Sequence, residues 1–113
     1  MTEERNFEGH GGGRFGAFVA LPRKLPAPAL VLLQEVYGVN RFMRRITESW
    51  AAQGFFAVCP DVYWRLKPGI VLDPETPGHR EQGRNLCGLA RSALRLAPSL
   101  PELACTEKTA IRR

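Results

Sequence analysis

The strongest constraint on the fold of this chain is the stretch 29–40, in which a wholly apolar run ends abruptly in polar residues. Residues 29–33 carry only apolar side chains, and Pro26 and Pro28 precede them. So short a run is typical of a strand buried on both faces, as in a parallel sheet, although periodicity alone also allows a buried helix segment. Glu35 follows just beyond the predicted strand. That end of a strand faces the ligand crevice in open α/β sheets, so this carboxylate is the leading functional candidate.

A βαβ unit is predicted around this stretch. Residues 40–53 form a predicted helix with one apolar stripe, made of Phe42, Ile46 and Trp50 with Met43 beside them. Asn40 is a suitable N-cap, and Gly54 is a suitable residue to end the helix. Residues 55–59 form the next short apolar run. Strand, helix and strand in this order predict two parallel strands joined by a crossover.

The remaining segments are predicted from the positions of glycine and proline and from the periodicity of apolar residues. Residues 15–20 form a predicted first strand, after a glycine-rich turn at 10–14. Residues 67–78 contain three prolines and two glycines and form a predicted loop. A second helix is predicted from about His79. Its apolar stripe would consist of Leu86, Leu89, Ala93, Leu94 and Leu96.

Length and composition limit the classes of protein to which the chain can belong. With 113 residues it can form one ordinary domain. The sequence has no basic-then-apolar start typical of a secretory signal and no run long enough to cross a membrane, so a cytoplasmic location is the default expectation. His and Cys residues do not occur at metal-ligand spacing, and we expect no metal site.

The net charge of +5 is unevenly distributed. Residues 1–79 contain nine basic and eight acidic side chains, whereas residues 80–113 contain seven basic and three acidic ones. One hypothesis is therefore a small basic module that contacts nucleic acid or an anionic partner through its C-terminal tail. No aromatic residues alternate with the tail arginines, which makes base stacking, and nucleic acid as a partner, a weaker expectation. Another hypothesis is a structural protein that completes its sheet with a second chain.

Motifs for nucleophilic catalysis are missing from the sequence. Gly-x-Ser-x-Gly and Gly-x-Cys-x-Gly are both absent, and Cys87-Gly88 lacks the first glycine and a leading strand. Cys59 is interpreted as a small buried residue at a strand end. Spacing alone favours Glu35 as an acid in a turn, solvated or bonded to backbone amides, over a functional role, and Arg80 as a surface arginine near a helix start.

Several segments resemble one family in order and spacing. They are Gln-Glu-Val-Tyr-Gly-Val-Asn at 34–40, Trp50 with Gln-Gly-Phe at 53–55, Val-Cys-Pro-Asp-Val-Tyr at 58–63, Pro-Gly at 68–69 and Leu-Asp-Pro at 72–74. From about Phe7 to about Gln82 the chain is similar to the N-terminal part of dienelactone hydrolases, also called carboxymethylenebutenolidases.

The resemblance implies a fold, an activity and roles for three residues. The fold would be the N-terminal portion of an α/β-hydrolase, a three-layer α/β structure with a mainly parallel sheet. The activity would be hydrolysis of a small-molecule lactone or carboxylic ester, dienelactone to maleylacetate, in aromatic-compound degradation and without a metal or organic cofactor. Glu35 would activate a cysteine thiol, the backbone amide of Val36 would contribute to the oxyanion hole, and Arg80 would hold the substrate carboxylate.

The chain also departs from the family pattern. The family's cysteine in Gly-x-Cys-x-Gly and its later Asp and His have no counterpart here. Similarity fades after Gln82, which predicts a family-like part at 1–82 and a divergent basic tail at 83–113, an out-of-frame or otherwise foreign segment. We therefore expect a truncated, inactive hydrolase whose open sheet edges favour poor solubility and non-specific self-association.

Overall fold

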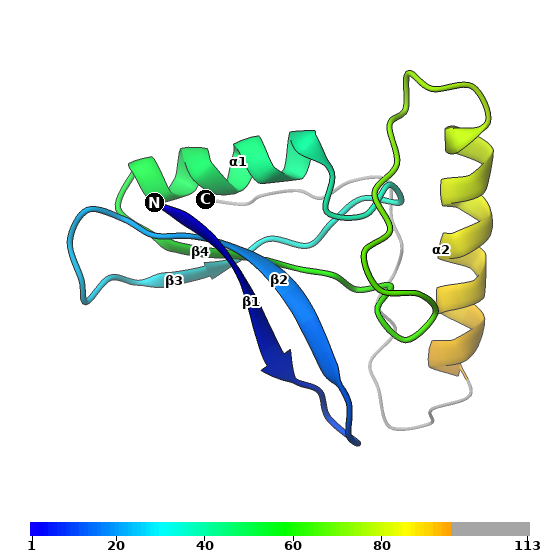
Figure 1. Ribbon diagram of the computed structural model, residues 1–113, viewed down its shortest axis with the longest axis horizontal. Coiled ribbons are helices and arrows are strands. Elements are labelled where there is room, and N and C mark those ends of the chain that lie inside the picture. The colour runs from blue at the N-terminus through cyan, green and yellow to red at the C-terminus, as the bar shows by residue number, and fades with distance from the viewer. Residues whose placement is uncertain (96–113) are drawn as a thin grey trace.

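A computed structural model describes residues 1–95 of the chain, and the side chains of residues 1–92. It contains a four-stranded mixed sheet and two helices (Figure 1). The elements are β1 (Thr2–Glu8), β2 (Arg14–Ala20), β3 (Ala29–Val31), α1 (Arg41–Ala52), β4 (Phe56–Pro60) and α2 (His79–Arg95). The strand order is β1-β2-β4-β3, in which β3 and β4 are parallel and the other two pairs are antiparallel. The predicted βαβ unit is thereby confirmed.

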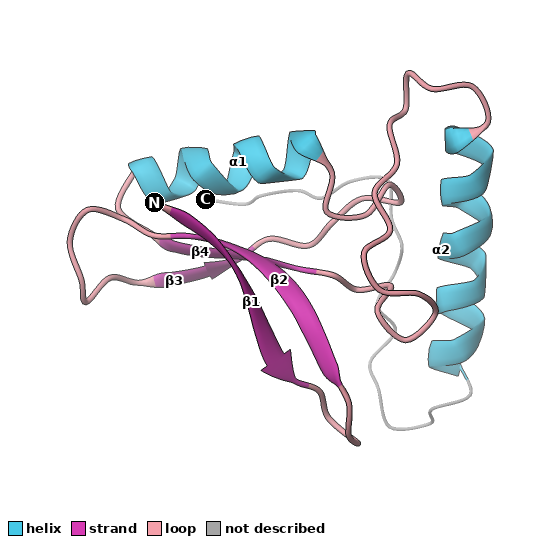
Figure 2. Cartoon of the chain, viewed as in Figure 1, coloured by secondary structure: helices cyan, strands magenta, loops and turns pink. Residues whose placement is uncertain are grey.

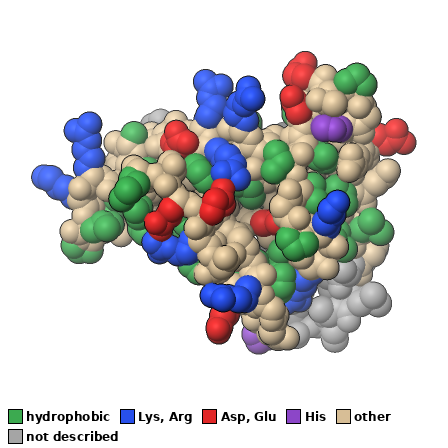
Figure 3. Space-filling view, in the orientation of Figure 1, with side chains coloured by type: hydrophobic (Ala, Val, Ile, Leu, Met, Phe, Trp, Pro, Cys, Tyr) green, Lys and Arg blue, Asp and Glu red, His purple; other side chains and the backbone are tan. Residues whose placement is uncertain are grey.

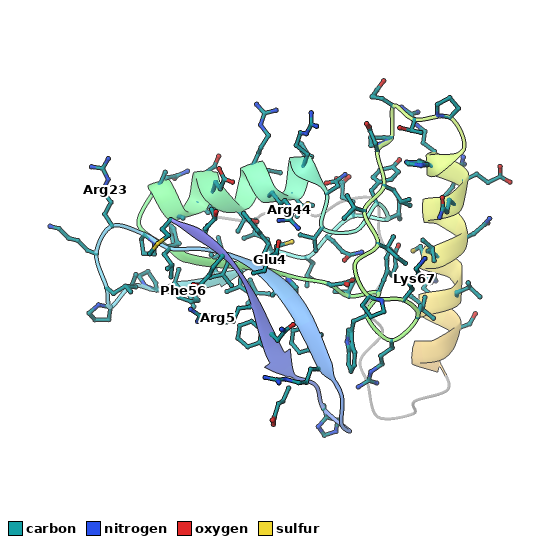
Figure 4. All side chains as sticks on the ribbon, in the orientation of Figure 1. Glu4, Arg5, Arg23, Arg44, Phe56 and Lys67 are labelled. Atoms are coloured by element: carbon teal, nitrogen blue, oxygen red, sulfur yellow. The ribbon has the colours of Figure 1, made fainter. Side chains whose placement is uncertain are left out.

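Strand β1 was not predicted from the sequence. It pairs with β2 in a hairpin closed by the glycine-rich turn, where the Gly9 N–H donates to the Gly13 carbonyl at 2.9 Å. Most of its side chains are polar and exposed, so no alternating apolar pattern marks it as a strand. Side-chain contacts also hold it in place: Phe7 stacks on Phe15 of β2. Glu4 pairs with Arg44 of α1, and the Arg5 guanidinium lies 5.7 Å from the ring centroid of Phe56 (Figure 4).

Helix α1 covers one face of the sheet and begins as predicted, because the Asn40 side chain accepts a hydrogen bond from the Met43 N–H at 3.1 Å. The predicted apolar stripe is confirmed in part, since Met43 is buried and Ile46 and Trp50 are partly buried against the core. Phe42, however, is 55% exposed, and the buried positions of α1 are Met43, Thr47 and Ala51. Thr47 can occupy the core because its hydroxyl donates to the Met43 carbonyl at 2.7 Å, which satisfies the polar group.

Strand β3 is shorter and more exposed than predicted. The expectation that both of its faces are buried is wrong, since the Val31 side chain is 61% exposed and Leu33 is 44% exposed. Leu30 and Leu32, which alternate with them, pack into the core beneath α1. The reason is that β3 is an edge strand of the described sheet and α1 covers only one of its faces.

Helix α2 stands beside the sheet, and the long connection that follows β4 lies between them (Figure 2). Its buried positions are Gly83 and Cys87, while Leu89 is 58% exposed. The predicted leucine stripe is therefore wrong at this position. Leu96, the last predicted member, lies outside the described residues, as do the side chains of Ala93 and Leu94. The predicted boundary between residues 82 and 83 falls inside α2 and stays a prediction.

Basic side chains project from the surface over α1 and over the β2–β3 loop (Figure 3). Arg84 and Arg91 of the predicted basic tail are exposed on α2, whereas Arg112 and Arg113 lie outside the described residues. Neither helix in residues 1–95 combines the length and hydrophobicity that crossing a bilayer would require.

Candidate functional site

The carboxyl ends of β3 and β4 meet at one edge of the sheet, because the two strands are parallel neighbours. Gln34 joins the segments that leave these strands. Its side-chain oxygen accepts a hydrogen bond from the Val62 N–H at 3.0 Å, and its side-chain nitrogen donates to the Glu35 carbonyl at 3.2 Å. This edge, which we call the rim, comprises residues 34–38 after β3 and residues 61–63 after β4.

Residues 35–38 form a tight turn on the rim, in which the Gly38 N–H donates to the Glu35 carbonyl at 3.3 Å. Gly38 has φ of +77°, and a Cβ atom there would lie 1.9 Å from the Ile70 carbonyl oxygen. Only glycine fits both demands. The Leu72 N–H donates to the Tyr37 carbonyl at 2.8 Å, so the 70–72 segment supports the turn from its other side.

Tyr63 supports the turn from the interior of the protein. Its side chain is 3% exposed, and its hydroxyl donates to the Val36 carbonyl at 3.0 Å. Burial raises the pKa of Tyr63 to about 12, so the hydroxyl keeps its proton over the physiological range. Asp61 fixes the backbone around it by accepting hydrogen bonds from the Tyr63 N–H at 3.0 Å and from the Gly69 N–H at 2.9 Å.

The backbone of the turn has paired carbonyl groups and unpaired N–H groups. The carbonyl groups of residues 35, 36, 37 and 38 each accept a hydrogen bond from within the chain. By contrast, the N–H groups of Val36 and Tyr37 donate to no acceptor in the part of the chain that the structure describes. Adjacent unpaired N–H groups can stabilise negative charge on a carbonyl oxygen, which is the chemistry of an oxyanion hole.

The three residues singled out by the family resemblance lie in two places. Glu35 and Val36 are on the rim, where Glu35 is exposed and Val36 is half-buried. Arg80 lies near the start of α2, is exposed, and donates through Nε to the Pro74 carbonyl at 3.0 Å. Within residues 1–92, no ion pair or hydrogen bond joins the Glu35 carboxylate to Arg80. Their roles in a common site stay a prediction.

Cys59 is confirmed as a buried residue of the core and has no exposed surface. Burial raises the pKa of its thiol to about 11, an effect that outweighs the hydrogen bond with the Thr47 side chain and the positive charge of Arg44. A protonated thiol beneath α1 cannot attack a substrate on the rim. The described residues also contain no group of three His, Cys, Asp or Glu side chains that could hold a metal ion.

Sequence reasoning missed two residues that shape the rim. The sequence gives Tyr63 no partner, because the Val36 carbonyl that its hydroxyl contacts lies 27 positions away in the sequence. Gly83 was assigned to the divergent tail, yet a Cβ atom at this position would lie 2.9 Å from the Val36 oxygen and 3.1 Å from its side chain. A glycine inside a helical pattern was the available signal, since it often marks close packing.

Comparison with known proteins bears directly on this architecture. Residues 15–94 match the model of the dienelactone hydrolase family. A carboxymethylenebutenolidase from Pseudomonas putida is 48% identical over 87 residues, which are 76% of this chain and 36% of that protein. A carboxymethylenebutenolidase from Pseudomonas sp. strain P51 is 45% identical over 74 residues, which are 66% of this chain and 31% of that protein. The chain thus spans about a third of the length of these relatives.

A solved structure shows the same likeness in three dimensions. The crystal structure from Klebsiella pneumoniae subsp. pneumoniae MGH 78578 that is provisionally assigned as a dienelactone hydrolase superposes with a TM-score of 0.54 at 25% sequence identity. The superposition covers 57% of this chain and 28% of the other.

Proposed function

The chain belongs to the dienelactone hydrolase family, and from this premise we propose that it carries part of a pocket for hydrolysis of a small lactone or carboxylic ester. The part in question is the rim, with the Glu35 carboxylate and the Val36 N–H beside it. The observation that carries the proposal is the turn at residues 35–38, whose carbonyl groups are all paired and whose Val36 N–H is unpaired within the described chain. That arrangement suits the stabilisation of an oxyanion.

In this proposal three groups divide the chemistry. The Glu35 carboxylate activates a thiol nucleophile by accepting its proton, so that the thiolate forms as Glu35 becomes a carboxylic acid. The Val36 N–H donates to the carbonyl oxygen as negative charge develops on it. Arg80 binds the carboxylate of a dienelactone, for which a guanidinium provides a planar pair of donors. The exposed position of both side chains leaves them accessible to a ligand.

The 113-residue chain alone is proposed to be inactive. Its sequence contains neither Gly-x-Cys-x-Gly nor Gly-x-Ser-x-Gly, and the described thiol Cys59 is buried beneath α1. The purified chain should therefore hydrolyse neither a dienelactone nor 4-nitrophenyl acetate faster than buffer does. Turnover that survives purification to homogeneity would contradict this part of the proposal.

A chimera tests the roles of the rim residues. Residues 15–94 of this chain would replace the matching segment of the Pseudomonas putida carboxymethylenebutenolidase, and dienelactone hydrolysis would be measured. We expect the chimera to be active and Glu35→Gln to lower kcat by roughly 100-fold. Arg80→Ala should raise KM roughly tenfold or more for the carboxylate-bearing dienelactone, and leave the neutral 4-nitrophenyl acetate unaffected.

Matched controls exist for both variants. Glu75→Gln removes an exposed carboxylate in the loop before α2, and Arg84→Ala removes an exposed guanidinium one turn after Arg80. Neither should change kcat or KM by more than about twofold, because both contribute only surface charge. An active chimera in which Glu35→Gln behaves like Glu75→Gln would refute the proposed role of Glu35.

A further inference from the structure

The Val36–Tyr37 peptide group is held on its oxygen side by two elements. From the rim segment after β4, the buried Tyr63 hydroxyl donates to the Val36 carbonyl at 3.0 Å. From α2, the backbone at Gly83 approaches the same oxygen so closely that a Cβ atom would lie 2.9 Å from it. Neither contact involves the Glu35 side chain. The buried Tyr63 hydroxyl and the helix residue Gly83 thus both constrain the orientation of one peptide plane.

The opposite side of this peptide plane follows from its geometry. The bond is trans, since the only cis bond among the described residues is Leu25–Pro26. In a trans peptide the carbonyl and the following N–H point to opposite sides. With the Val36 oxygen directed at Tyr63 and α2, the Tyr37 N–H must point away from both. The same reasoning applies one peptide earlier, where the Glu35 carbonyl accepts from Gly38 and from the Gln34 side chain and leaves the Val36 N–H on the other side.

We propose that Tyr63 is a positioning residue that orients the Tyr37 N–H outward at the rim, so that this amide and that of Val36 form a donor pair for an anionic carbonyl or carboxylate oxygen. The proposal rests on the proposed function, which uses only the Val36 amide, and adds a second donor with its support. Its ligand class is a small molecule bearing a carboxylate or a carbonyl that gains negative charge, because adjacent unpaired N–H donors bind such oxygens.

The first test needs no variant. In the ¹⁵N-labelled full chain, amide hydrogen exchange should be slow for Leu72, which donates to the Tyr37 carbonyl at 2.8 Å. The Tyr37 N–H should exchange within about tenfold of the rate of an unstructured chain, since it has no internal acceptor. A protected Tyr37 amide would overturn the proposal, because it would show that this donor is already occupied.

The second test uses acetate, the simplest carboxylate, titrated against chloride at equal ionic strength. We expect the amide resonances of Val36 and Tyr37 to shift with acetate and not with chloride. Tyr63→Phe removes the hydroxyl and keeps the ring, and should reduce the acetate-induced shift at position 37 roughly threefold while the shift at Val36 changes less. Tyr37→Phe is the matched control, as it removes the other rim hydroxyl and should leave both shifts intact.

A third variant keeps the proposal falsifiable if Tyr63→Phe does not fold. Gly83→Ala leaves the hydroxyl in place and displaces the Val36 oxygen from the α2 side, so it should also weaken the acetate response at position 37. An unchanged response at this position in a folded Tyr63→Phe or Gly83→Ala protein would overturn the proposal. An inactive chimera with a Tyr63-dependent acetate response would refute the proposed function alone, and an active chimera without that dependence would refute the positioning role alone.

Discussion

Helices α1 and α2 differ in what their buried faces meet. α1 packs on β2 and β4 and buries Met43, Thr47 and Ala51 against the sheet. α2 packs to no comparable extent on any described strand, and its buried face approaches the rim turn through Gly83. The first helix therefore acts through the volume of its side chains, and the second through close backbone approach. Stability should accordingly depend mainly on α1, and the conformation of the rim mainly on α2.

The largest expected effect tests the packing of α1. Met43→Ala removes a side chain that is 4% exposed and should lower the free energy of unfolding by roughly 2–4 kcal/mol, since it leaves a cavity between α1 and the sheet. Urea unfolding followed by circular dichroism measures it. The control is Phe42→Ala on the adjacent, 55% exposed position, which should change stability by no more than about 0.5 kcal/mol. Equal effects at the two positions would mean that α1 does not pack as described.

The next largest effect is a loss of stability at alkaline pH. It distinguishes the core under α1, which contains Cys59, from the rim, which contains Tyr63. Burial raises the pKa of Cys59 from its ordinary 9.0 to about 11. Below pH 9 the thiol is protonated in both the folded and the unfolded chain. Between about pH 9 and 11 only the unfolded chain loses this proton. The free energy of unfolding therefore falls as pH rises, by on the order of 2 kcal/mol. Cys59→Ala should postpone the onset toward pH 10, where Tyr63, whose pKa is raised to about 12, begins to contribute.

Urea midpoints of the wild-type chain and of Cys59→Ala, measured across this pH range, provide the comparison. Identical pH profiles would show that folding does not raise the pKa of the Cys59 thiol.

Asn40 supports both the start of α1 and the segment beside the rim. It caps the helix, and its side-chain nitrogen donates to the Leu72 carbonyl at 3.2 Å. Asn40→Ala should lower the free energy of unfolding by about 1–2 kcal/mol, because both bonds are lost. Asn40→Ser keeps an oxygen that can cap the helix and loses the donor to Leu72 without adding a buried charge, so a smaller loss is expected. If the two variants are equally destabilised in thermal melts, the cap contributes nothing.

A pair of glycines in α2 gives the smallest effect and the sharpest contrast. Gly88→Ala places a methyl group in open space and should stabilise the chain by up to about 1 kcal/mol through higher helix propensity. Gly83→Ala gains the same propensity, but its methyl group meets the Val36 oxygen at 2.9 Å, so it should bring no gain or a loss. Melting temperatures of the two variants test this, and an equal gain at both positions would show that α2 does not press on the rim.

Local patterns predicted the βαβ unit and the Asn40 cap, because each depends mainly on residues that are neighbours in the chain. They also predicted that Glu35 follows β3, although the strand ends at Val31, earlier than expected. Strand β1 escaped prediction since its polar side chains carry no alternation, and its pairing partner β2 lies across a turn. The buried face of α1 was predicted only in part, because Phe42 is exposed while Thr47, whose hydroxyl donates to the Met43 carbonyl, lies in the core. The Tyr63 contact could not be predicted, as it joins segments that only the folded sheet brings together.

The two edge strands of the described sheet, β1 and β3, differ in the chemistry of their side chains. This difference determines at which edge a further strand would be added. β1 borders solvent with charged side chains such as Glu4 and Arg5, which discourage another strand from docking there. β3 borders solvent with Val31, whose exposed apolar side chain favours the docking of another strand. Any strand that extends this sheet, whether from the same polypeptide or a separate one, should therefore add beside β3.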